Sequence, residues 1–210
     1  MAGKSQKIMI QGIWKDNPVF RQILGICSAL AVTNLMLNSL VMGLGLIFVT
    51  AFSEFTVSLI RKWTPKHIRM MVQTLIISAY VIIVDIFLKA YYPGISAALG
   101  PYVGLIITNC IIMGRCESFA QNNPPHLAFL DGVASGTGYL LVLLVISFFR
   151  ELLGFGTLFG TLFGINVLGE AWISWTLMIM PPGAFFMLGI LIWITKNMIS
   201  DKPAKGGAKS

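Results

Sequence analysis

Residues 22–53 read QILGICSALAVTNLMLNSLVMGLGLIFVTAFS, a run without any Asp, Glu, Lys or Arg. About 20 apolar residues in a helix suffice to cross a bilayer core about 30 Å thick. The run is therefore too long for one helix, and Asn34 and Asn38 divide it into predicted spans at 19–33 and 40–60. Three further runs also lack these charged residues: 90–114, 132–149 and 171–195.

The composition agrees with a membrane protein. The 210 residues are 56% hydrophobic and 11% charged, whereas globular chains are about 25% charged. The net charge of +7 does not indicate nucleic acid as a partner, because the basic residues lie in the gaps between apolar runs, where orientation signals belong. We therefore expect an all-α, polytopic membrane protein without a soluble active-site cleft.

Six transmembrane spans are expected, and an even number places both termini on one side of the membrane. The four spans after the first two are predicted at 70–91, 95–114, 130–149 and 177–198. If the termini are cytoplasmic, 13 of the 15 Lys and Arg residues lie inside, and only Lys89 and Arg150 lie outside. The sequence therefore predicts a multi-pass protein of the bacterial inner membrane with cytoplasmic N- and C-termini.

Three spans precede Pro93 and three follow it, so matching spans of the two halves enter the membrane from opposite sides, as in an inverted repeat. Both halves are expected to open with a broken or half helix. The first span offers about 15 apolar residues, or about 22 Å of helix, and Gly100, Pro101 and Gly104 interrupt the fourth. The predicted organisation is a cytoplasmic segment at 1–18, a first half at 19–91, an inverted half at 92–199 and a disordered tail at 200–210.

Each of the two interrupted spans carries a cysteine, Cys27 in the first and Cys110 in the fourth. One interpretation is that each is a small hydrophobic side chain without a further role. The other is metal ligation, since soft thiolates select iron–sulfur clusters. Two cysteines make half of a four-cysteine site, so this interpretation requires a partner membrane protein. Cys116, beside Arg115, is predicted to be a bystander.

Three acids within the predicted spans are candidates for an ion pathway, because an ionisable group inside a membrane usually marks one. Asp131 opens the fifth span, where a boundary acid or helix cap is the alternative. Asp85 stands four residues before Lys89, which favours a salt bridge. Glu54 lies deeper in its span than the other two acids.

Three segments carry a family resemblance: LGICSALAVT at 24–33, VGLIITNCIIMGR at 103–115 and FFREL at 148–152. They resemble the NqrDE/RnfAE family of membrane subunits, and the match extends from Asn17 to Trp193. The resemblance implies a component of the sodium-translocating NADH:ubiquinone oxidoreductase (Nqr), without activity on its own. It also implies a homologous partner of opposite topology, the E subunit of that complex, together with its A, B, C and F subunits.

The same resemblance implies a 2Fe–2S iron–sulfur cluster held by Cys27, Cys110 and two cysteines of the homologous E subunit. That cluster would relay electrons between flavins across the membrane, coupled to sodium export, while other subunits bind the flavins and NADH. Asp85 and Asp131 match positions that the family associates with sodium movement, whereas Glu54 matches no family motif. No residue of this chain is expected to be catalytic by itself.

Two other functions remain open. Two segments look like Nqr: Cys27-Ser-Ala-Leu and Val84-Asp-x-x-Leu-Lys-Ala90. Two others, Met180-Pro-Pro-Gly-Ala-Phe185 and Gln11-Gly-Ile-Trp14, look closer to Rnf. The chain would then be the E subunit of the Rnf ferredoxin:NAD oxidoreductase, which is also ion-translocating. A stand-alone secondary transporter would show the same inverted repeat and broken helices, with incidental cysteines.

Overall fold

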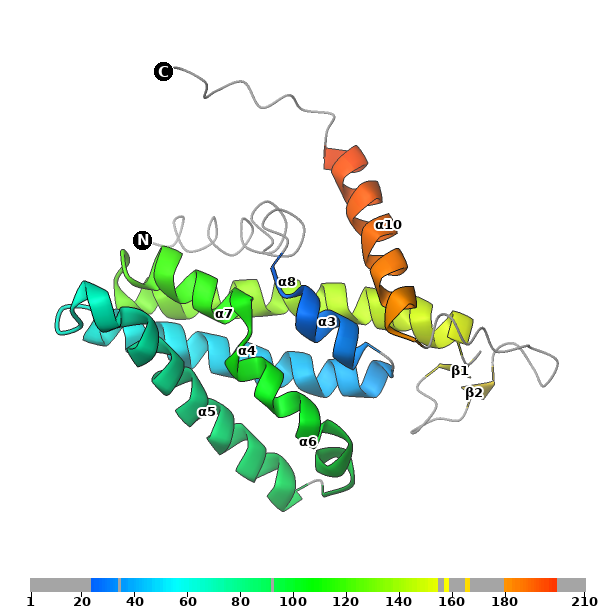
Figure 1. The fold of residues 1–210 in the computed structure, drawn as a ribbon, viewed down its shortest axis with the longest axis horizontal. Helices are drawn as coiled ribbons and strands as arrows, with labels where there is room; N and C mark the ends of the chain where they lie inside the picture. Colours follow the sequence, from blue (N-terminus) through cyan, green and yellow to red (C-terminus); the bar gives the residue numbers. More distant parts are fainter. Residues whose placement is uncertain are drawn as a thin grey trace.

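The structure is a computed structural model that describes residues 24–33, 35–91, 93–154, 157–158, 165–166 and 180–199. The described residues are almost entirely helical (Figure 1). One short antiparallel pair, β1 (Thr157–Leu158) and β2 (Ile165–Asn166), places Thr157 opposite Asn166. The predicted N-terminal segment at 1–18, the tail at 200–210 and the start of the sixth span lie outside the described residues.

Two long helices, α4 (Met36–Ile60) and α8 (Pro125–Gly154), run side by side through the centre of the molecule (Figure 1). Glycines let them approach closely. A Cβ on Gly132 would come within 2.7 Å of the Ala51 Cα, and one on Gly136 within 2.9 Å of the Ile47 Cα. Small residues drive helix association of this kind in membranes, because lipid tails provide no hydrophobic force between helices.

The helix α5 (Arg69–Tyr91) follows α4 through the turn η2 (Lys66–Ile68) and presents most of its apolar surface outward. Met71 and Leu75 are 75% and 71% exposed, as expected of side chains that face lipid. Among the described residues, four helical segments are long and apolar enough to span a membrane: Met36–Ile60, Lys66–Tyr91, Tyr102–Ala120 and Pro125–Gly154. The predicted all-α, polytopic membrane class is confirmed.

Two points of non-helical backbone, which we call breaks, lie beside a cysteine. The seven-residue α3 (Ile26–Val32) begins after Gly25, which has a φ of 82°. The next break, at 108–109, separates α6 (Pro93–Ile107) from α7 (Cys110–Arg115), which continues as the π-helix η3 (Cys116–Ala120).

The predicted position of the break in the fourth span is wrong. Gly100, Pro101 and Gly104 all lie inside α6, because membrane helices tolerate Gly and Pro where local adjustments satisfy the backbone. Likewise, Asn38 does not end a helix but lies within α4.

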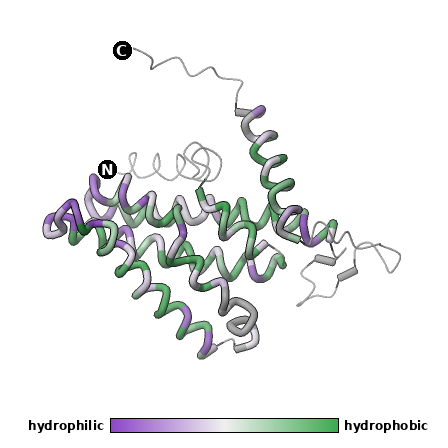
Figure 2. The backbone as a smooth tube through the Cα atoms, in the orientation of Figure 1, coloured by the Kyte–Doolittle hydropathy of each residue, from purple (hydrophilic) through white to green (hydrophobic). Residues whose placement is uncertain are grey.

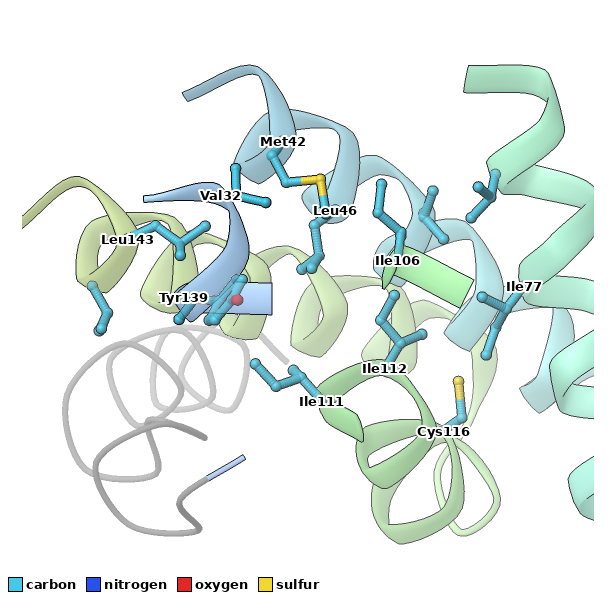
Figure 3. Close-up of a cluster of buried hydrophobic side chains, with 14 of the residues drawn as sticks. Val32, Met42, Leu46, Ile77, Ile106, Ile111, Ile112, Cys116, Tyr139 and Leu143 are labelled. Carbon is cyan, nitrogen blue, oxygen red and sulfur yellow. The ribbon is translucent and has the colours of Figure 1, made fainter. Parts of the chain in front are cut away.

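Charged residues gather at one end of the bundle, where the α4–α5 and η3–α8 connections lie together (Figure 2). Arg61 Nη1 donates to the Asn123 carbonyl at 2.9 Å, and Arg69 pairs with Glu117 at 3.1 Å. The last described helix, α10 (Pro181–Ile199), projects away from the body of the molecule (Figure 1). The apolar core between α3, α4, α7 and α8 is drawn in Figure 3 and includes Leu46, Ile111, Ile112, Tyr139 and Leu143.

Candidate functional site

The two breaks lie together. The backbone N–H of Gly25, just before α3, donates to the Cys110 Sγ at the start of α7, at 2.9 Å. Cys27 lies two residues after Gly25 in the first turn of α3. Its side chain is exposed, whereas that of Cys110 is half-buried. The fold therefore brings Cys110 to the beginning of the helix that carries Cys27.

A buried polar network joins the two breaks. The Tyr139 hydroxyl, on α8, lies 2.5 Å from the Ser28 hydroxyl and donates to the Gly25 carbonyl at 3.2 Å. From the other break, Asn109 Nδ2 donates to the Ser28 hydroxyl at 3.2 Å. Asn109 Oδ1 also accepts the Ile111 N–H at 3.1 Å and so caps α7. Burial of polar groups is tolerated when they are hydrogen-bonded in this way.

Sequence reasoning missed Tyr139, Ser28 and Asn109. The available signal was an asparagine immediately before Cys110 and a single tyrosine in the charge-free run at 132–149. In the structure the Tyr139 side chain is fully buried and lies against α3 (Figure 3).

The donor set at the two breaks fits half of an iron–sulfur site. Within the described part of the chain, no group of three or more His, Cys, Asp or Glu residues could hold a metal ion. A four-thiolate cluster that used Cys27 and Cys110 would thus need ligands from another chain, and the exposed Cys27 is accessible to one. The third cysteine, Cys116, is fully buried in the hydrophobic core.

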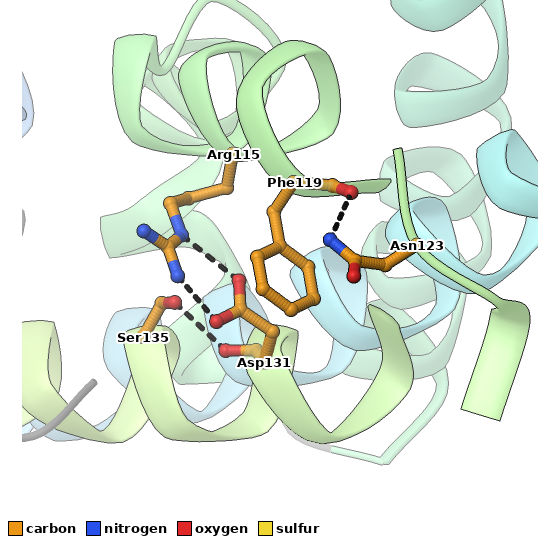
Figure 4. Close-up of polar contacts among 5 residues, drawn as sticks. All are labelled: Arg115, Phe119, Asn123, Asp131 and Ser135. Atoms are coloured by element: carbon orange, nitrogen blue, oxygen red, sulfur yellow. Dashed lines mark hydrogen bonds and ion pairs between the residues drawn. The ribbon is translucent and has the colours of Figure 1, made fainter. Parts of the chain in front are cut away.

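A buried charged cluster lies at the other end of α7. Arg115 donates through Nε to Asp131 Oδ2 at 2.9 Å, and through Nη2 to Asp131 Oδ1 (Figure 4). The guanidinium also lies 5.6 Å from the centre of the Phe119 ring. Arg115 and Asp131 are only 8% and 2% exposed. Asp131 therefore does not cap α8 but forms a bidentate ion pair inside the bundle.

Glu54 of α4 belongs to the same cluster. It is fully buried and interacts electrostatically with both Asp131 and Arg115. Neither of its carboxylate oxygens accepts a hydrogen bond from the described residues. The cluster thus places two carboxyl groups beside one guanidinium.

Asp85, the third candidate acid, is not part of this cluster. Its carboxylate accepts from Lys89 Nζ at 2.6 Å on the surface of α5, and the two side chains are 23% and 63% exposed. The predicted salt bridge between these residues is confirmed. The structure thus brings Glu54 and Asp131 together, whereas Asp85 pairs with Lys89 on its own helix.

The far end of α8 contacts the connection between α3 and α4. Arg150 Nη1 donates to the Thr33 hydroxyl at 2.6 Å, and Nη2 donates to the Met180 carbonyl at 3.4 Å. Glu151 Oε2 accepts the Met36 N–H at 2.9 Å, at the start of α4. The pattern of apolar runs gave no indication of these contacts.

Comparison with known proteins identifies the family. The family model described as "Rnf-Nqr subunit, membrane protein" matches residues 5–192. The chain belongs to this family. The D subunit of the Na⁺-translocating NADH-quinone reductase of Chlamydia felis is 49% identical over 92% of this chain and 93% of its own length. The corresponding D subunits of Psychromonas ingrahamii and Pseudomonas paraeruginosa are 46% and 45% identical, over 93% and 94% of this chain and 93% and 89% of their own lengths.

Membership of the Rnf-Nqr family confirms the resemblance on which the sequence interpretation depends. The three segments that carried it lie around the features just described. The segments at 24–33 and 103–115 contain the two helix breaks, and the segment at 148–152 contains Arg150 and Glu151. In this member of the family the motif residues therefore gather where helices are interrupted or joined.

Proposed function

We propose that this chain is the D subunit of a Na⁺-translocating NADH-quinone reductase, a multi-subunit translocase. The observation that carries the proposal is its identity of 45–49% to subunits of that name, over almost the full length of both chains. Because these relatives are all subunits of the reductase, they favour the reductase over the Rnf complex. A stand-alone transporter is disfavoured, because the matching family is one of subunits.

We further propose that Cys27 and Cys110 supply two ligands of a 2Fe–2S cluster, with two more from a homologous E subunit. Such a cluster, when bound, supplies one-electron transfer between flavins held by other subunits. Gly25 donates its N–H to the Cys110 sulfur, and donors of this kind tune cluster sulfurs. Ile111 and Ile112, which follow Cys110 in the sequence, are both fully buried.

The proposed architecture is two inverted halves, 19–91 and 92–199. Support comes from reciprocal contacts between α4 and α8, where Gly43 faces Leu140 and Gly136 faces Ile47. Positions 43 and 136 differ by 93, as do 47 and 140, so each contact maps onto the other when the halves are exchanged. Each half also has a helix break directly before its cysteine.

The termini are proposed to be cytoplasmic. The basic α4–α5 connection lies at one end of the bundle with the η3–α8 connection, joined by the bond from Arg61 to Asn123. Lys89 and Arg150 lie near the opposite ends of α5 and α8. This separation follows the excess of basic residues on the cytoplasmic side of membrane proteins.

An ion route is proposed to pass Glu54 and Asp131, with Asp85 nearer the opposite surface. The support is electrostatic, because Glu54 is buried beside the ion pair of Arg115 and Asp131, and ionisable groups within a membrane commonly mark such routes. Glu54 in particular has oxygens that accept no hydrogen bond from the described residues. Sodium is the ion that the names of the relatives specify.

The deciding experiment is iron analysis of the purified complex. Cys27→Ser and Cys110→Ser should each abolish the visible absorption of the cluster and stop electron flow to quinone. Cys116→Ala is the matched control, since this thiol is buried in the apolar core and should leave iron content unchanged. Wild-type iron content in both serine variants would overturn the ligand assignment.

A further inference from the structure

The Tyr139 hydroxyl joins α8 to α3 and to the residue directly before α3. It contacts Ser28 Oγ at 2.5 Å and the Gly25 carbonyl at 3.2 Å, while the tyrosine ring is fully buried. The same Ser28 hydroxyl accepts from Asn109, the residue before Cys110. The phenol group thus bonds directly to one break and is linked to the other through Ser28.

The backbone of Gly25 needs hydrogen bonds that hold it in one conformation. Its φ of 82° lies in the left-handed region, and without a Cβ it has the widest conformational freedom of any residue. The site also requires a glycine, because a Cβ there would lie 2.5 Å from Ile111 Cδ1 and 3.0 Å from Tyr139 Cε2. The Gly25 carbonyl accepts from the Tyr139 hydroxyl and from the Ala29 N–H. These bonds fix the orientation of Gly25, whose N–H points at the Cys110 sulfur.

We propose that Tyr139 is a positioning residue: through Gly25 and Ser28 it keeps the Gly25 N–H on the Cys110 sulfur and so sets the redox potential of the bound cluster. This role rests on the proposed ligation by Cys27 and Cys110. An N–H donor to a ligand sulfur stabilises the more negative, reduced cluster, so its loss lowers the midpoint potential.

The test compares two tyrosine-to-phenylalanine changes in the purified complex. Tyr139→Phe removes the hydroxyl and should lower the midpoint potential of the cluster and alter its paramagnetic resonance spectrum. Tyr80→Phe is the matched control, because the Tyr80 hydroxyl also bonds a hydroxyl side chain, that of Thr56 at 2.8 Å, but on α4 and away from both breaks. It should leave potential and spectrum unchanged. Equal potentials in Tyr139→Phe and the wild type would overturn the proposal.

A second variant tests the proposal even if Tyr139→Phe does not fold. Ser28→Ala removes the hydroxyl that Tyr139 and Asn109 share, and should shift the potential in the same direction. If Tyr139→Phe does not assemble, Ser28→Ala decides the question alone. The two proposals fail in different ways. If Cys27→Ser and Cys110→Ser both keep their iron, the ligand assignment fails; if both lose their iron while Tyr139→Phe and Ser28→Ala keep the wild-type potential, only the positioning role fails.

Discussion

Arg150 of α8 donates to the hydroxyl of Thr33 at 2.6 Å, and both side chains are buried. Thr33 is the C-cap of α3, the short helix that carries Cys27. Its hydroxyl in turn donates to the Ala29 carbonyl at 2.6 Å, within α3. The end of α3 is therefore fixed by a charged group from the second half of the chain, in addition to the polar network at its beginning.

Replacing Arg150 should loosen α3. Arg150→Gln shortens the side chain and removes the charge-assisted bond to Thr33, and hydrogen bonds to charged groups contribute about 1.5–3 kcal/mol. We expect a lower unfolding midpoint of the purified complex and a partial loss of cluster absorption. Lys89→Gln, which breaks an exposed pair on α5, should cost less than about 1 kcal/mol. Similar losses in both variants would count against a special role for Arg150.

The ion pair of Arg115 and Asp131 should behave as a coupled unit. Arg115→Gln and Asp131→Asn each remove one member of a buried pair, and breaking such a pair costs about 3–5 kcal/mol. The double variant should cost clearly less than the sum of the two. A double-mutant cycle on denaturant unfolding measures this coupling, and the partly exposed pair of Arg69 and Glu117 provides the control cycle. Additive effects at Arg115 and Asp131 would contradict the bidentate contact.

Local signals in the sequence predicted the helices better than the contacts between them. The third span was predicted at 70–91, and α5 covers Arg69–Tyr91. Charge-free runs report on burial in lipid, which is a property of each segment alone. A break in the fourth span was predicted too, but it was assigned to Pro101 and its neighbouring glycines. The actual break is at 108–109, where the Asn109 side chain accepts the Ile111 N–H and caps α7.

The contacts within the site could not be predicted, because they depend on how separate helices pack. Ser28 and Tyr139 are 111 positions apart, and Arg115 and Asp131 belong to different helices. Asp131 resembled a boundary acid only because the predicted fifth span began at residue 130, whereas α8 begins at Pro125. The earlier start places Asp131 within the helix, where it meets Arg115.

Because α4 and α8 approach closely, we expect the stability of the protein to depend strongly on the glycines between them. Gly132→Ala places a Cβ 2.7 Å from the Ala51 Cα, which is backbone and cannot turn aside. We expect the helices to separate, with a loss of about 1–3 kcal/mol or more measured by thermal unfolding. Gly45→Ala is the control on α4, because its Cβ would meet only Val84 Cγ1 at 3.6 Å among the described residues. That change should be neutral or stabilising by about 0.5–1 kcal/mol.

Glu54 offers the sharpest test of the ion route. It is fully buried beside Asp131 and Arg115, and its oxygens accept no hydrogen bond from the described residues. Glu54→Gln keeps the shape and removes the carboxyl group that could ionise to bind a cation. We expect turnover of the complex to require at least about tenfold more sodium for half-maximal rate, equivalent to about 1.4 kcal/mol of lost binding.

The control for Glu54→Gln is Glu117→Gln on η3, whose carboxylate bonds Arg69 and Gln73 and is 42% exposed. Because water already screens that charge, its removal should leave the sodium titration unchanged. An unaltered titration in Glu54→Gln would remove this acid from the route, whereas equal shifts in both variants would indicate a general electrostatic effect. A shift confined to Glu54 would place the ion beside the Arg115–Asp131 pair, at the end of the helix that begins with Cys110.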